Sequence, residues 1–175
     1  DLQMLALARA DAAELRTETV DLVALARELT RHWWPRAREA GIDLGFDATP
    51  NGLSTPAQPV LLQEALGNLL HNALRYSPPG SRVTVHVTQD GRDALLTVQD
   101  DGPGLAADEL ERASERFFRG RHARPGGSGL GLAIARAVAE RHGGSLALQP
   151  GPGGSGLAVS LRLPLAHHRA NTGFP

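Results

Sequence analysis

The sequence lacks two residue types altogether and has little of a third. It contains no cysteine, which excludes disulfide bonds and thiolate metal sites. It also contains no lysine, because all 18 residues of the Lys+Arg total are arginine. A phosphate-binding P-loop needs a lysine after its glycines, so that large class of nucleotide-binding proteins is excluded as well. Aromatic residues make up only 4% of the chain, and the core must therefore be built from aliphatic side chains.

Long apolar runs and an excess of charge are also missing. No run is long enough to span a bilayer and no signal peptide follows Asp1, so we expect no membrane segment in this chain. The net charge is only -1, which gives no reason to expect a nucleic acid partner. A length of 175 residues predicts one domain, or one domain with a fragment of a neighbouring one.

Helix-like and strand-like segments alternate along the chain. Amphipathic periodicity with closing glycines indicates three helices, and period-two alternation indicates five strands. This order predicts an α+β fold with the helices on one face of a mixed or antiparallel sheet. The expected helices cover residues 21–41, 54–77 and 127–144, and the expected strands cover residues 42–48, 82–90, 94–100, 145–150 and 157–164.

Two asparagines, Asn68 and Asn72, interrupt the leucine-rich helix pattern that ends at Ser77. Asparagine is a mediocre helix former, so each of them needs a reason. At about 100° per residue, Asn68 falls on the polar face with Glu64 and Arg75, and Asn72 falls at the border of the apolar stripe. Two interpretations stay open: both amides are solvated, or their oxygens coordinate a hard cation such as Mg²⁺ or a phosphate-bound water.

The segment "VQDDGPGL" ends a strand at Asp100 and turns through Gly102 and Gly104. An acidic turn of this kind is common and needs no function. The alternative is a carboxylate at the floor of a pocket, beside glycines that let a planar ring approach. Because a carboxylate only accepts hydrogen bonds, it would select an exocyclic amine such as that of adenine.

Two glycine-rich segments stand near the end of the chain. In "PGGSGLGLAIAR", glycines at 127, 129 and 131 lead into a helix, whose first backbone N–H groups can bind phosphate. The spacing differs from the dinucleotide-binding fingerprint, and no strand precedes it. The second segment, "GPGGSGLAVSLRLP", reads by itself as a hairpin loop between two strands.

The order of these segments resembles the catalytic, ATP-binding domain of bacterial sensor histidine kinases, in the gyrase/chaperone/MutL ATPase superfamily. "EALGNLLHNALRYS" looks like the N box of that family, and "DDGPG" looks like its first glycine box. "ERFFRG" looks like its F box, while "GGSGLGLAIAR" and "GGSGLAVSLRLP" look like the second and third glycine boxes. The resemblance runs from about Val20 to Pro164. It implies a two-layer α/β sandwich of the Bergerat type, with about five strands, about three helices on one face and a flexible ATP lid.

The resemblance also implies domain boundaries. Residues 1–16 would be the end of a helix of the dimerisation and histidine-phosphotransfer domain. Residues 17–165 would be the catalytic domain, and residues 166–175 would be a flexible tail. The lid would cover residues 105–126, with Phe117 and Phe118 either anchoring it or serving as plain core aromatics.

Roles for single residues follow from the same resemblance. Asn72 would be the Mg²⁺ ligand, and Asn68 would contact phosphate or metal-bound water. Arg75 and Arg119 would face the phosphates, so Asn68, Arg75 and Arg119 are the expected catalytic set. Asp100 would bind the adenine amine. The full nucleotide-binding set would be Asn68, Asn72, Arg75, Tyr76, Asp100, Gly102, Gly104, Leu105, Arg119, Gly127, Ser128, Gly129, Leu130, Gly131, Leu132 and Gly156.

Two positions depart from the patterns of the family and the superfamily. Leu157 stands where the family often has a threonine, so a hydroxyl contact near the adenine is missing. Asn68 stands where ATP-hydrolysing members of the superfamily carry a glutamate. An amide cannot serve as a general base, which favours a kinase that holds ATP for another acceptor.

The expected function is that of a kinase fragment. It would bind Mg²⁺-ATP and pass the γ-phosphate to a histidine on the adjoining domain, for relay to an aspartate of a response regulator. The parent would be a homodimer of the bacterial inner membrane with this domain in the cytoplasm. Two alternatives stay open: an ATP-hydrolysing or serine-kinase relative of the superfamily, and an ATP-binding module that serves only for docking.

Overall fold

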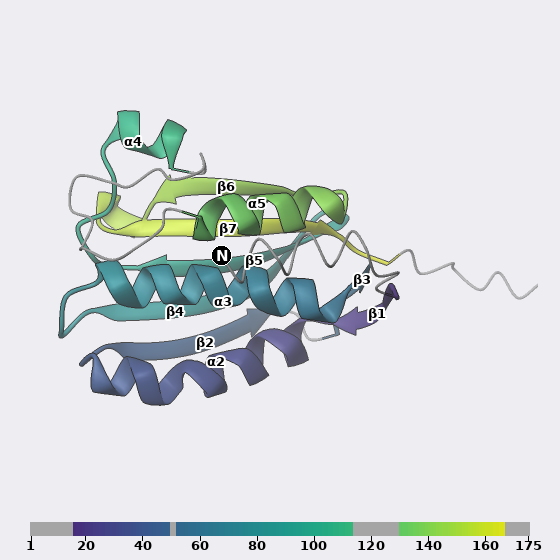
Figure 1. Ribbon diagram of the computed structural model, residues 1–175, viewed down its shortest axis with the longest axis horizontal. Coiled ribbons are helices and arrows are strands. Elements are labelled where there is room, and N and C mark those ends of the chain that lie inside the picture. Colours follow the sequence, from purple (N-terminus) through teal and green to yellow (C-terminus); the bar gives the residue numbers. More distant parts are fainter. Residues whose placement is uncertain (1–15, 50–51, 114–129, 167–175) are drawn as a thin grey trace, which may run out of the picture.

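A five-stranded mixed sheet forms one layer of the molecule (Figure 1). The computed structural model describes residues 16–49, 52–113 and 130–166. Strands β2 and β4 run parallel, and every other neighbouring pair is antiparallel, which confirms the predicted mixed sheet. The strands lie in the order β2 (Asp43–Thr49), β4 (Arg82–Asp90), β5 (Asp93–Asp100), β7 (Leu157–Pro164) and β6 (Ser145–Pro150).

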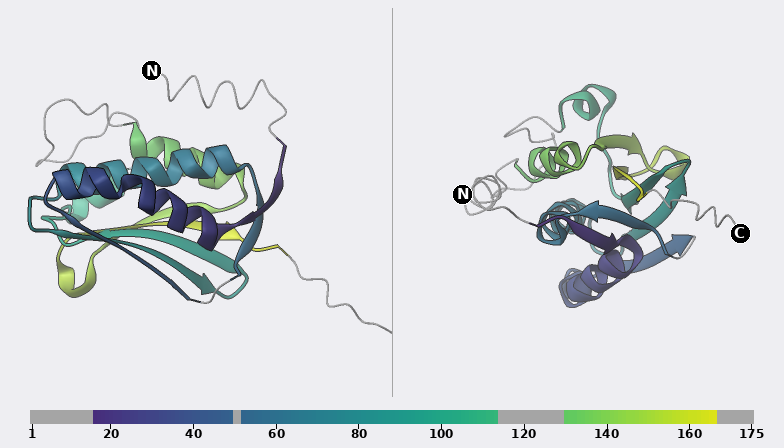
Figure 2. Two further views of the ribbon diagram at one scale, coloured as in Figure 1. Left: turned by 90° about the horizontal axis from the view of Figure 1, so that it is seen from below. Right: turned by 90° about the vertical axis from the view of Figure 1, so that its right-hand side faces the viewer.

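Three helices form the second layer and cover one face of this sheet (Figure 2, left). They are α2 (Leu22–Glu39), α3 (Pro59–Tyr76) and α5 (Gly131–Arg141). Helix α3 lies in the middle and contacts both of the others. A short helix, α4 (Ala107–Arg112), follows β5, and a 3₁₀ turn, η1 (Pro152–Gly154), lies between β6 and β7.

The core lies between the two layers and is aliphatic, as the composition predicts. Strand β4 shows the alternation: Val83, Val85 and Val87 are fully buried, while Thr84 and His86 point to the uncovered face of the sheet. Helix α3 contributes the leucines that oppose these valines. Among the residues that the structure describes, no aromatic side chain belongs to the buried apolar set.

A second, two-stranded sheet was not predicted. Strand β1 (Glu18–Asp21) pairs antiparallel with β3 (Ser54–Ala57), so the expectation that a helix starts at residue 54 is wrong. Helix α3 begins at Pro59 instead, where the missing N–H of proline costs nothing. Residues 54–57 are held as a strand by contacts that are distant in sequence, including the Thr55 hydroxyl, which donates to the carbonyl of Pro164.

The first turn of α3 is tied to the end of α5 by a histidine. The backbone N–H of Gln58, the N-cap residue of α3, donates to Nε2 of His142 over 3.1 Å. Because Nε2 accepts this bond, the ring proton sits on Nδ1, which donates to the carbonyl of Val138 over 2.7 Å. One imidazole therefore joins two helices of the layer.

The predicted ends of the chain lie almost entirely outside this description. Of the expected end of a dimerisation helix, residues 1–16, only Arg16 is described, and of the expected tail, residues 166–175, only Ala166 is described. None of the helices that are described is both long and apolar enough to cross a bilayer.

Candidate functional site

The carboxylate of Asp100 is fixed at the end of β5 by two backbone N–H groups. Its Oδ1 accepts hydrogen bonds from Gly102 over 3.0 Å and from Leu157 over 3.3 Å. Burial raises the pKa of Asp100, the two hydrogen bonds partly offset that rise, and the charge of Asp101 adds to it. Within the described part of the chain, Oδ2 accepts no hydrogen bond, so this oxygen can serve a donor from a ligand.

Two glycines let distant segments of the chain approach each other at Asp100. A Cβ built at Gly104 would lie 2.6 Å from the carbonyl oxygen of Gly156, and one built at Gly156 would overlap the carbonyl of Asp100. Both residues also have positive φ values, +69° and +75°, which other residues rarely adopt. The first and third glycine boxes, far apart in sequence, thus meet around Asp100.

The amide of Asn72 lies against the first residue of α5. A Cβ built at Gly131 would be 3.2 Å from Nδ2 and 3.4 Å from Oδ1 of Asn72. Gly131 is also the start of the helix, where N–H groups have no partner within the helix. The structure therefore places an amide of the N box beside a helix terminus suited to anions.

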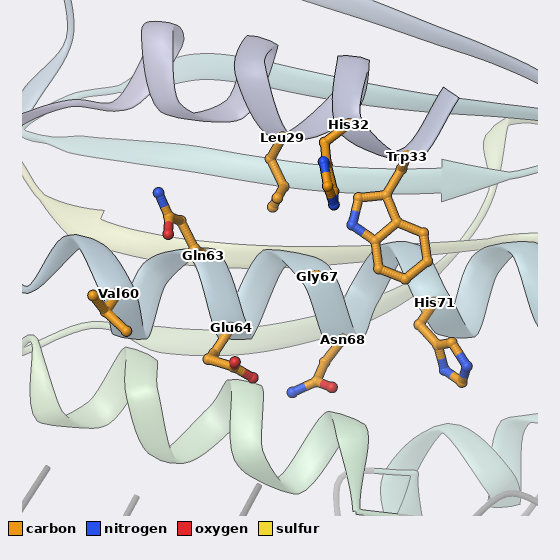
Figure 3. A pocket seen from close by; sticks show the side chains of 9 residues that line it. All are labelled: Leu29, His32, Trp33, Val60, Gln63, Glu64, Gly67, Asn68 and His71. Atoms are coloured by element: carbon orange, nitrogen blue, oxygen red, sulfur yellow. The ribbon is translucent and has the colours of Figure 1, made fainter. Parts of the chain in front are cut away.

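Asn68 is not on a polar face, and that expectation is wrong. The residue is only 5% exposed, because α5 covers the side of α3 that a lone helix would turn to solvent. Glu64 and Asn68 extend from α3 on the side of α5 (Figure 3). The sequence held one signal of this burial: apolar residues at positions 61, 65 and 69 extend the stripe of α3 towards Asn68.

The remaining expected residues divide between described and undescribed parts. Arg75 and Tyr76 are half-buried in the last turn of α3, Leu130 is buried before α5, and Leu132 is half-buried in its first turn. The expected lid starts at the half-buried Leu105 and includes α4. Arg119, Phe117, Phe118, Gly127, Ser128 and Gly129 lie outside the described residues.

A groove of about 350 Å³ lies between α2 and α3 (Figure 3) and was not predicted. The rings of His71 and Trp33 meet in an edge-type contact with centroids 6.2 Å apart, and the guanidinium of Arg36 stacks 4.6 Å from the centroid of Trp33. Asn68 borders this groove and Asp100 does not. The groove is lined by Leu29, His32, Trp33, Val60, Gln63, Glu64, Gly67, Asn68 and His71.

The sequence did not predict that Leu157 contacts Asp100, because this contact is made by the backbone of Leu157. The side chain at this position offers no hydroxyl, yet its N–H orients Asp100. Such a contact has no residue-type signal. In the described ranges, no group of three His, Asp or Glu side chains is arranged to hold a metal ion.

Comparison with known proteins gives a consistent set of relatives. The family described as "Histidine kinase-, DNA gyrase B-, and HSP90-like ATPase" matches residues 57–167. The sensor protein IrlS of Burkholderia pseudomallei is 37% identical over 147 residues, which are 81% of this chain. The histidine-protein kinase/phosphatase MprB of Mycobacterium ulcerans is 37% identical over 163 residues, 90% of this chain. This chain spans 31% of the length of each relative.

Solved structures agree with these sequences. The structure of a mycobacterial sensor histidine kinase MprB superposes with a TM-score of 0.75 at 35% identity, covering 85% of this chain and 98% of that one. Full-length ShkA, solved in complex with AMPPNP, gives a TM-score of 0.78 at 29% identity, over 94% of this chain and 35% of that one.

Proposed function

This chain belongs to the histidine kinase-, DNA gyrase B- and HSP90-like ATPase family, and we propose that it binds Mg²⁺-ATP for transfer of the γ-phosphate to a histidine. Two observations support this proposal: the fixed carboxylate of Asp100, and the amide of Asn72 beside the start of α5. Asp100, with Oδ1 held by two N–H groups, offers an oriented acceptor for the amine of a base. Asn72 beside Gly131 offers an amide oxygen at a helix N-terminus, where phosphates are favoured.

The donor set fits a magnesium ion that shares phosphate oxygens. Asn72 would hold the ion, and Asn68 would contact phosphate or metal-bound water, since amide oxygens are suitable ligands for this hard cation. When bound, Mg²⁺ neutralises charge on the phosphates during transfer. Arg75 and Arg119 would add positive charge at the same end, and Gly102, Gly104 and Gly156 would give the base room against the backbone.

A kinase is favoured over a hydrolase by the chemistry of Asn68. This side chain is an amide, and it is buried beneath α5. It cannot take a proton from an attacking water, so ATP is kept for an acceptor on another domain. We propose that the acceptor is a histidine of an adjoining dimerisation domain, and that the phosphoryl group then passes to a response-regulator aspartate.

The setting of the parent protein is proposed from the relatives. Those relatives carry names of sensor proteins and signal-transduction kinases. We infer a homodimeric parent in the bacterial inner membrane, with this domain on the cytoplasmic side.

Calorimetry with ADP and AMPPNP in the presence of Mg²⁺ tests the proposal. Asn72→Asp places a negative charge beside the phosphates, and Asp100→Ala removes the acceptor for the amine, so both should abolish measurable binding. Asp101→Asn is the control, because Asp101 binds the N–H of Arg82 and is exposed. Unchanged affinity in either site variant contradicts the assignment.

Two further readouts separate the alternatives. An ATP-binding module that serves only for docking would bind nucleotide but would not phosphorylate the dimerisation domain of the parent when that domain is added. An ATP-hydrolysing relative would release phosphate from ATP without any partner domain, whereas we expect no turnover from this chain alone.

A further inference from the structure

Ser77 carries a buried hydroxyl with no partner among the described residues. The residue follows the last turn of α3 and is 2% exposed. Its backbone N–H donates to the carbonyl of Ala73 over 3.1 Å, but its Oγ is buried and makes no hydrogen bond. An unpaired buried hydroxyl is costly, and native proteins keep few of them, so this one needs an explanation.

The position of this hydroxyl links it to Asp100. A Cβ built at Gly102 would lie 3.1 Å from Oδ1 of Asp100 and 3.5 Å from Oγ of Ser77. Both oxygens therefore lie beside Gly102, where residue 102 has no side chain to separate them from a ligand. Leu157 supplies a backbone N–H to Asp100 but no hydroxyl. Among the described residues, Ser77 thus places a hydroxyl close to the carboxylate of Asp100.

We propose that Ser77 is a second base-recognising residue, whose hydroxyl donates, directly or through one water, to ring nitrogen N1 of adenine. This inference rests on the proposed binding of an adenine nucleotide. The 6-amine of adenine and its N1 are adjacent, one a donor and the other an acceptor. A carboxylate accepts from the first, and a hydroxyl can donate to the second. Guanine has a carbonyl oxygen, an acceptor, at position 6, and this oxygen would be repelled by the carboxylate of Asp100.

The unpaired state of the hydroxyl then has a function. In the protein without nucleotide, Ser77 is desolvated and lowers stability, and binding supplies the missing partner. Replacing it by alanine removes the cost and the recognition together. A serine with only a structural role would behave in the opposite way, because its loss would lower stability.

Calorimetry on Ser77→Ala with three diphosphates tests the proposal, with Mg²⁺ present throughout. ADP has both groups, 1-deaza-ADP has C–H in place of N1, and purine riboside diphosphate lacks the 6-amine. We expect the substitution to lower the affinity for ADP and for purine riboside diphosphate by about fivefold, which corresponds to the loss of one hydrogen bond. It should leave the affinity for 1-deaza-ADP unchanged. The melting temperature without nucleotide should hold or rise.

Ser81→Ala is the matched control. Ser81 is the other buried serine of the loop, and its backbone carbonyl accepts from the N–H of Asp43 at the start of β2. This variant should bind all three diphosphates as the unmodified chain does.

Equal affinity for ADP in Ser77→Ala and the unmodified chain overturns the inference. An equal loss for ADP and 1-deaza-ADP also overturns it, as does a lowered melting temperature with uniformly weaker binding. The proposed function fails in a different way, because the unmodified chain would then bind none of the diphosphates.

Discussion

Gly67 and Gly131 are two glycines of the helical layer that differ in what surrounds them. A Cβ built at Gly131 would press on the amide of Asn72 at 3.2 Å, while one built at Gly67 would meet nothing within 4 Å. We expect Gly131→Ala to displace Asn72 and to weaken Mg²⁺-ADP binding about tenfold, since small misplacements at such sites cost heavily. Calorimetry checks the loss.

Gly67→Ala is the comparison that controls for adding a methyl group to a helix. It should stabilise the protein by about 0.5–1 kcal/mol, because glycine is unfavourable in a helix interior. Its nucleotide affinity should not change. Similar affinities for the two alanine variants would show that Asn72 does not depend on the space at Gly131.

The charge of Asp100 makes stability depend on pH. The pKa of Asp100 in the folded protein is raised above 3.8. The contribution of this group to stability is therefore fully present below pH 3.8, and it is lost as the pH rises through the raised pKa. Asp100→Asn stays neutral and keeps Oδ1 as an acceptor. We therefore expect this variant to be more stable than the unmodified chain near neutral pH, with the difference shrinking as the pH falls.

Urea denaturation without nucleotide at several pH values measures this effect. Asp101→Asn is measured in parallel as the control. It removes the neighbouring charge but leaves the carboxylate of Asp100 in place. A variant Asp100→Asn that is less stable at neutral pH would mean that the surroundings favour the charged form.

Residue types in the sequence pointed to Asp100, Asn72 and the glycines, because each has a chemistry that the pattern exposes. The burial of Asn68 and the backbone contact of Leu157 depend on α5 and β7, which come from other parts of the chain. A single helical pattern contains no information on which neighbour covers its second side. The unpaired hydroxyl of Ser77 was invisible for the same reason.

Between elements, His142 provides a bond that neither helix could make alone. The N-cap of α3 has no side-chain hydrogen bond of its own, and the N–H of Gln58 uses the ring of His142 instead. His142→Phe keeps an aromatic ring at this position but removes the acceptor for the N–H of the buried Gln58. We expect a loss of about 1–3 kcal/mol in the free energy of unfolding.

Chemical denaturation measures that loss as a shift of midpoint at constant slope. His86→Phe is the control, because His86 lies on the uncovered face of the sheet, where aromatic residues are tolerated. Equal stability in both variants would mean that the link between α3 and α5 contributes nothing.

The elements with strong local periodicity were predicted, whereas β3, which depends on a distant partner, was not. All five strands of the large sheet and the three helices that cover it follow from alternation and amphipathic patterns. The pattern of the sequence predicts a helix start at β3, because four residues with a proline show no clear alternation. Its conformation comes from pairing with β1 and from contacts with the end of β7.

At the scale of the whole molecule, the predicted boundaries of the catalytic domain can be tested by truncation. The described fold begins with β1 at Glu18 and ends after β7 at Pro164, with Ala166 still donating to the carbonyl of Ser54. We expect a protein of residues 16–166 to unfold in one cooperative transition and to bind ADP with the affinity of the full chain. Loss of either property would place a boundary elsewhere.

The bond between Leu157 and Asp100 has a consequence for the order of folding. It joins positions 57 residues apart, so it forms only after a long loop has closed. A pocket that depends on this contact is completed late, after the hairpin of β4 and β5. Bound nucleotide should then lower the unfolding rate far more than it raises the folding rate. The nucleotide-bound domain would therefore have a long lifetime before it unfolds.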